Sequence, residues 1–167
     1  MGNLPKCFLL FYHERLLEPE VPGHLDDNTS KKPSSEGPYE QYVDNLGIRI
    51  EGWMGDDLMT IDPCYIVTSV LRDALTASAL SGFEIDTVDV SFDKQLLMFP
   101  DMAASWPIPK LYWLKITGKA GNDDFGLSPA DAPVMLVVSG HSLNLLQSFH
   151  LESCEVSEYV PRIILGS

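Results

Sequence analysis

The sequence predicts an α/β (α+β) protein in which a mixed sheet carries two short helices, each capped at its start by a serine. Three observations favour this fold. Of 167 residues, 45% are hydrophobic and 10% aromatic, which is typical of one globular domain. Short β-branched runs occur beside apolar residues at helical spacing. The order strand, serine, helix, strand also occurs twice, which predicts a sheet covered by helices.

Each predicted helix begins at a serine that follows a strand. We expect Ser69 and Ser139 to cap helices over Val70–Ala79 and Gly140–Phe149. A serine hydroxyl accepts hydrogen bonds from the free backbone N–H groups of a first helical turn. In both segments apolar residues recur on one helical face, so that face is expected to pack on the sheet.

The two units also match in sequence position. Pro63–Ser69 corresponds to Pro133–Ser139 at an offset of 70 residues, whereas Glu84 corresponds to Glu155 at an offset of 71. This predicts a weak internal β-α-β duplication in which one residue is gained in the helix or in the loop after it. The alternative is a coincidence between two common elements.

The strands are predicted from short apolar or alternating runs: Lys6–Tyr12, Leu46–Trp53, Cys64–Thr68, Phe83–Phe92, Leu111–Thr117, Val134–Val138, Cys154–Val160 and Arg162–Leu165. Within Phe83–Phe92 the alternation slips by one residue at Thr87, which predicts a bulge or a bend. We expect a single domain over residues 1–167. The segment Glu18–Asn45 is rich in Pro, Gly, Ser and Asp, and it predicts a long loop that is functional or mobile.

The charge of the chain limits its partners. Asp and Glu number 24 against 11 Lys and Arg, which gives a formal net charge of -13. Such a field repels nucleic acids and anionic membranes and attracts basic proteins. The alternative is an acidic surface that only keeps the protein soluble. The start does not resemble a secretion signal, and the three cysteines (Cys7, Cys64 and Cys154) fit free thiols, so we expect a cytoplasmic protein.

No motif of a known catalytic, phosphate-binding or metal centre was recognised, so we expect no cofactor and no enzymatic activity. Two acid pairs, Asp56–Asp57 and Asp123–Asp124, could hold a hard cation or serve as general acid and base. We interpret them as solvated acidic loops. A metal-dependent enzyme using these pairs stays open as an alternative function, as does a module that binds a small ligand.

The acidic residues gather in segments that also hold tryptophans, and no Lys or Arg lies between Gly121 and Val160. Acidic rims around aromatic anchors suit a basic protein partner, because aromatics carry much of an interface's energy and charges steer the encounter. The expected partner-binding residues are Asp123, Asp124, Glu84, Asp86, Asp89, Glu155, Trp53 and Trp113. Each tryptophan could instead belong to the core.

The repeated units, Val67–Ile85 and Val137–Val156, resemble bacterial immunity proteins of polymorphic toxin systems. The strand Trp113–Ile116 and the loop Asp124–Gly126 fit the same resemblance, which spans about Leu46 to Val160. The nearest families are immunity protein family forty-three and a related family formerly classed as a domain of unknown function. The resemblance implies an α/β protein without enzymatic activity that binds and neutralises a cognate toxin. It carries over no binding residues, and the Glu18–Asn45 segment departs from it.

Overall fold

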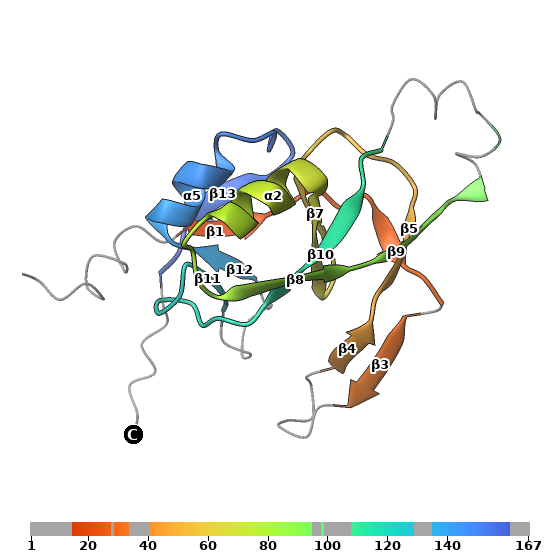
Figure 1. The fold of residues 1–167 in the computed structure, drawn as a ribbon, viewed down its shortest axis with the longest axis horizontal. Coiled ribbons are helices and arrows are strands. Elements are labelled where there is room, and N and C mark those ends of the chain that lie inside the picture. The colour runs from red at the N-terminus through yellow and green to blue at the C-terminus, as the bar shows by residue number, and fades with distance from the viewer. Residues whose placement is uncertain are drawn as a thin grey trace, which may run out of the picture.

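The computed structural model describes residues 15–27, 29–33, 41–94, 98, 108–128 and 135–160. Within them the chain forms a mixed α/β fold that is mostly sheet, with helices that are few and short (Figure 1). In chain order the elements are β1 (Arg15–Glu18), β2 (Gly23–Leu25), β3 (Ser30–Pro33), β4 (Gln41–Asn45), β5 (Gly47–Ile50), β6 (Leu58–Ile61), β7 (Cys64–Thr68), α2 (Ser69–Ala77), β8 (Phe83–Thr87), β9 (Asp89–Phe92), β10 (Leu111–Ile116), β11 (Phe125–Leu127), β12 (Leu136–Val138), α5 (Gly140–Leu146) and β13 (Glu155–Glu158).

Two four-stranded sheets share one spatial arrangement of strands, although their middle strands are connected differently. Sheet A has the order β11-β12-β1-β13 and sheet B the order β6-β7-β10-β8. In sheet B, β10 is antiparallel to both β7 and β8, and in sheet A, β1 is antiparallel to both β12 and β13. Both predicted β-α-β units are therefore present, and each has a third strand inserted between its two parallel strands.

The register of the inserted strands shows how the two units correspond. Tyr112 of β10 pairs with Val67 and Thr87, and Leu16 of β1 pairs with Val137 and Ser157. Val137 lies 70 residues after Val67, and Ser157 lies 70 residues after Thr87. The offset is constant, so the predicted step to 71 is wrong and Glu84 does not correspond to Glu155. Pairing with a shared middle strand, which the sequence pattern could not reveal, sets the register.

The two helices lie on the same side of the sheets in Figure 1. Leu71 and Leu75 of α2 and Leu146 of α5 are buried in a core shared by sheets A and B. Ser139 caps α5 as predicted, because its hydroxyl accepts a hydrogen bond from the Ser142 backbone N–H at 3.2 Å. The cap of α2 is Thr68, so the prediction of Ser69 is wrong by one residue.

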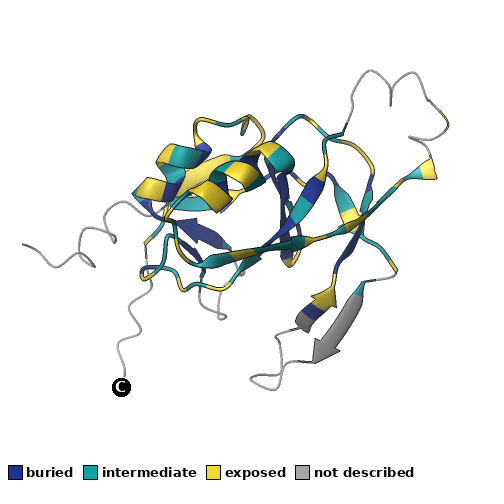
Figure 2. Cartoon of the chain, in the orientation of Figure 1, coloured by how far each residue is buried: buried dark blue, intermediate teal, exposed yellow. Residues whose placement is uncertain are grey.

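A second core lies on the opposite face of sheet B, under sheet C, which has the order β2-β5-β9. Ile48 and Ile50 of β5 meet Ile66 and Trp113 there, and Figure 2 shows these buried strands in dark blue. The predicted bend near Thr87 is confirmed and its cause is clear. The chain leaves sheet B after β8 and enters sheet C with β9, which pairs in parallel with β5.

The Glu18–Asn45 segment, predicted as a long loop, forms short strands in its described residues. It contains β2, β3 and β4, and β3 pairs with β4 as a separate two-stranded sheet. These strands are only 3–5 residues long, too short for a clear alternating pattern. The expected strands Lys6–Tyr12 and Arg162–Leu165 lie outside the described residues. In the described part of the chain, no helix is both long and apolar enough to cross a membrane.

Candidate functional site

The predicted acidic residues lie on three separate parts of the fold. Glu84 and Asp86 are on β8, the outer strand of sheet B, and Asp89 begins β9 in sheet C. Glu155 begins β13, the outer strand of sheet A. Asp123 and Asp124 stand immediately before β11. The structure therefore distributes these acids over different sheets instead of gathering them into one cluster.

Three of these acids lie exposed outside any ion pair of the described residues. Glu84, Asp89 and Glu155 are exposed, and none of them forms an ion pair with any other described residue. Asp86 differs, because Lys115 Nζ lies 2.6 Å from its carboxylate. That hydrogen bond lowers the pKa of Asp86 below its usual range. Glu84, Asp89 and Glu155 are thus the predicted acids best placed to attract a cationic partner.

Asp124 supports the fold instead of standing exposed in a loop. It is half-buried, and its carboxylate accepts hydrogen bonds from the Ser139 hydroxyl at 2.6 Å and from the Ser81 backbone N–H at 3.0 Å. Asp57 makes the matching contacts in the other unit, with the Thr68 hydroxyl at 2.6 Å and the His150 backbone N–H at 2.9 Å. Each aspartate therefore joins the cap of one helix to the loop that follows the other helix.

The neighbouring acid of each pair also faces protein donors. The carboxylate of Asp123 accepts the Lys119 backbone N–H at 2.9 Å. Gly82 packs closely against Asp123. Its φ is +93°, and a Cβ added at Gly82 would lie only 2.8 Å from the Cβ of Asp123, so no other residue fits there. Asp56 is fully buried and accepts the Ser153 backbone N–H at 2.9 Å. Burial raises the pKa of Asp56 above its usual range. The interpretation of both pairs as solvated loops is therefore wrong for Asp56, Asp57 and Asp124.

The described residues contain no group of three or more His, Cys, Asp or Glu side chains that could hold a metal ion. The bonds already made by Asp57 and Asp124 also direct their oxygens toward backbone and hydroxyl donors. This arrangement suits structural support better than cation binding or proton transfer.

The two tryptophans occupy positions inside the fold. Trp113 is only 7% exposed and belongs to the second core, with Lys115 Nζ 4.4 Å from the centre of its ring. Trp53 is half-buried against the same core, and its indole N–H donates to the Asp56 carbonyl at 2.9 Å. Trp113 cannot contact a partner in this fold, so its assignment as a partner-binding residue is wrong.

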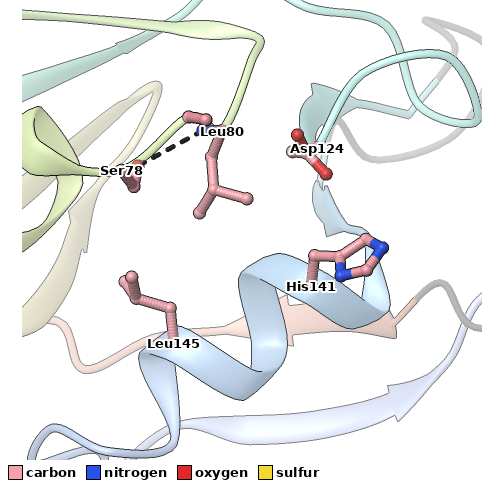
Figure 3. A pocket seen from close by; sticks show the side chains of 6 residues that line it. Ser78, Leu80, Asp124, His141 and Leu145 are labelled. Carbon is pink, nitrogen blue, oxygen red and sulfur yellow. Dashed lines mark hydrogen bonds between the residues drawn. The ribbon is translucent and has the colours of Figure 1, made fainter.

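A shallow hollow of about 380 Å³ lies between the end of α2 and the face of α5 (Figure 3). Its lining residues are Ser78, Ala79, Leu80, Asp124, His141 and Leu145. Leu80 and Leu145 give it an apolar wall, and His141 lies exposed on α5. Among the described contacts His141 bonds to neither Ser139 nor Asp124, so these three side chains do not form a nucleophile and base. The hollow can accept an apolar or weakly polar group.

The sequence-based assignment named only Glu155 of an acidic edge formed by Glu18, Glu152, Glu155 and Glu158. Glu18 and Glu155 stand directly opposite each other across the β1–β13 pair. The hydrogen bond between their side chains, with partial desolvation and mutual repulsion, raises the pKa of Glu18. The stretch without Lys or Arg from Gly121 to Val160 signalled three of these residues, but Glu18 joins them only through strand pairing.

Comparisons with known proteins add no relative to this description. No protein-family model matches the chain, and no curated protein or solved structure is similar enough to be matched to it.

Proposed function

We propose that this protein binds and neutralises a basic protein partner, in the manner of a bacterial immunity protein that inhibits a cognate toxin domain in the cytoplasm. The observation that carries the proposal is the exposure of Glu84, Asp89 and Glu155, three acids that form no ion pair with a described residue, although Lys115 stands opposite Glu84 across the β8–β10 pair. They stand on a chain whose net charge is -13. Unpaired surface acids lower the energy of an approaching cationic surface.

The physics of such an interface explains the arrangement. Close charge pairs between two proteins contribute about 1.5–7 kcal/mol of coupling, and rim charges mainly raise the association rate. Acids already paired within the chain, such as Asp86 with Lys115, can offer less to a partner because their charge is partly neutralised. Exposed unpaired acids on outer strands meet the requirements of steering without any catalytic group.

The experiment combines co-expression with charge reversal. The chain would be co-expressed with the product of the neighbouring gene, and association would be measured at about 50 mM and 500 mM salt, where the Debye length falls about threefold. We expect the double variant Glu84→Lys/Asp89→Lys, or the single variant Glu155→Lys, to slow association at low salt by about tenfold.

The matched control is Asp73→Lys, which reverses one exposed charge on α2 that forms an ion pair with its neighbour Arg72. An equal loss in this control would mean that net charge, not a defined surface, controls binding. Equal affinity at both salt concentrations would overturn the steering argument, and failure to retain any basic protein would remove the support for the immunity function.

A small-ligand binding module is the second candidate, and the hollow beside α5 favours it. Its volume of about 380 Å³ falls within the range of about 300–1,000 Å³ typical of ligand pockets. A ligand held there would raise the unfolding temperature of the wild type, and His141→Ala would reduce that rise. The metal-dependent enzyme is tested in the same assay with Mg²⁺, Ca²⁺ or Mn²⁺, and an increase abolished by Asp123→Asn would favour it.

A further inference from the structure

Strand β13 is the outer strand of sheet A within the described part of the chain. It pairs with β1 on one side, from Glu18↔Glu155 to Arg15↔Glu158, and no described strand pairs with its other side. All four of its residues are exposed. An outer strand leaves alternate backbone N–H and C=O groups unpaired, so β13 can template a further strand.

The side chains of this edge are acidic on both faces of the strand. Successive residues of a strand point to opposite faces, so Glu155 lies on one face and Glu158 on the other. Glu18 stands opposite Glu155, and Glu152 is exposed just before the strand. Arg15, opposite Glu158, is the only Lys or Arg in the β1–β13 pair, and it already has an interaction within the chain.

The like-charge pair Glu18–Glu155 at this edge forms no ion pair with a described residue. The hydrogen bond with Glu155, with partial desolvation and the repulsion between the two groups, raises the pKa of Glu18, and no cation opposes the rise. A Lys or Arg placed beside Glu18 and Glu155 would relieve the repulsion. An added strand is the element that brings side chains to this position, because its residues stand in register with those of β13.

The same charges decide which strand can pair here. A second copy of this chain would bring its own Glu155 and Glu158 against these residues, and like charges directly opposite are unfavourable. A segment that carries Lys or Arg at alternate positions gains ion pairs on one face instead, either with Glu155 and its cross-strand neighbour Glu18 or with Glu158. Val156, 44% exposed, and Val160, 75% exposed, offer apolar contacts to the residues between those cations.

We propose that the free edge of β13 binds an extended, Lys- or Arg-bearing segment of the protein partner as an added strand of sheet A. This inference rests on the proposed function and deepens it, because it names the surface and the form in which the partner is recognised. Backbone hydrogen bonds hold the segment, and Glu18, Glu155 and Glu158 select its charge.

The test uses the full-length chain and a synthetic peptide of about eight residues that alternates Lys and Val, long enough to span a strand. Binding would be followed by amide NMR shifts and hydrogen exchange. We expect the peptide to protect the amides of β13 and to bind about tenfold less tightly to Glu155→Lys/Glu158→Lys. Asp73→Lys, at an exposed position of α2, is the control and should leave peptide binding unchanged.

Three further results, one with a peptide and two with the protein alone, would overturn the inference. If a peptide of equal charge that is N-methylated at alternate amides binds equally well, charge alone is responsible and no strand forms. If the β13 amides that point away from β1 are already protected in the free monomer, another part of this chain occupies the edge. If the protein dimerises through β13 as its concentration rises, the edge is an interface between two copies.

Measurements of binding to the whole partner protein distinguish failure of this inference from failure of the proposed function. A basic partner that is retained, bound less tightly by Glu84→Lys/Asp89→Lys and unaffected by Glu155→Lys/Glu158→Lys would leave the proposed function standing and overturn the β13 site. Peptide binding at β13 in the absence of any basic protein partner would support the edge as a binding site and count against the immunity function.

Discussion

Two buried carboxylates, Glu20 and Asp56, show how single residues make this fold sensitive to pH. Glu20 is 7% exposed and Asp56 is fully buried. The Glu20 carboxylate accepts the backbone N–H groups of Met54 and Asp56, yet Asp56 Oδ1 is buried without a hydrogen bond to any described group. Burial raises the pKa of both residues. The folded state therefore holds protons on these groups more tightly than the unfolded chain does.

The sign of the pH dependence follows from that difference. Because the folded pKa values of Glu20 and Asp56 are raised, their contribution to stability is greatest at low pH. It decreases as pH rises above the ordinary pKa values, 4.5 for Glu20 and 3.8 for Asp56. Asp56→Asn removes one buried charge and keeps an oxygen that can accept the Ser153 N–H. We expect it to become more stable relative to the wild type as pH increases, which urea unfolding at several pH values would measure.

The control for this measurement is Asp73→Asn, a change at an exposed carboxylate of α2. It should change stability by less than about 0.5 kcal/mol. A stability difference between Asp56→Asn and the wild type that does not change with pH would contradict the assignment of Asp56 as a buried charge.

At the scale of elements, the two helices are held by the same device. Asp57 precedes β6 and accepts a hydrogen bond from the hydroxyl of Thr68, the cap of α2. Asp124 precedes β11 and accepts a hydrogen bond from the hydroxyl of Ser139, the cap of α5. Their second oxygens bind backbone N–H groups in the loop after the opposite helix. Each carboxylate therefore holds a helix cap and the loop after the opposite helix together. Moving either segment away would break a hydrogen bond and leave its donor without a partner.

These contacts predict that Asp57→Ala and Asp124→Ala each lower the free energy of unfolding by about 1–3 kcal/mol, since each removes a cap contact and leaves buried donors unpaired. Chemical denaturation would measure the loss. Asp73→Ala, on the exposed side of α2, should change stability by less than about 0.5 kcal/mol. An Asp124→Ala variant with an unchanged free energy of unfolding would show that Asp124 is a surface acid without a structural role.

At the scale of the whole molecule, the first described strand, β1, completes sheet A, whose other strands come from the end of the chain. β1 lies between β12 and β13, at a place that β10 fills in the other unit. Leu17 of β1 is only 1% exposed and joins the core that both helices cover. The unit β11-β12-α5-β13 is therefore incomplete without a strand from more than one hundred residues earlier in the chain. Folding must wait for this long-range pairing, because closing such a loop costs entropy before any contact is gained.

We predict that a chain lacking residues 1–18 loses cooperative unfolding, and that a synthetic peptide of residues 1–20 added in trans restores it. The restoring peptide should fill the gap between β12 and β13. A peptide carrying Leu17→Asp is the control, since a charge at this buried position is unfavourable. Calorimetry would follow the transition. A truncated chain as stable as the full one would show that β1 does not complete the sheet.

The sequence by itself determined the features that depend on neighbouring residues. The helix beginning after Ser139, the buried run Cys64–Thr68 and the change of phase near Thr87 all follow from local spacing, since each residue there is read against others a few positions away. Composition also determined the net charge and, with it, the kind of partner that we propose.

Tertiary structure alone decided which distant residues meet. Asp57 binds the His150 amide across 93 positions, Glu18 meets Glu155 through the β1–β13 register, and Trp113 is buried by sheet C. Local patterns contain no information about such pairings, because register and burial are set by which strands share a sheet. The cap of α2 falls on Thr68 for the same reason: Asp57, eleven residues away, holds that hydroxyl and not the one of Ser69.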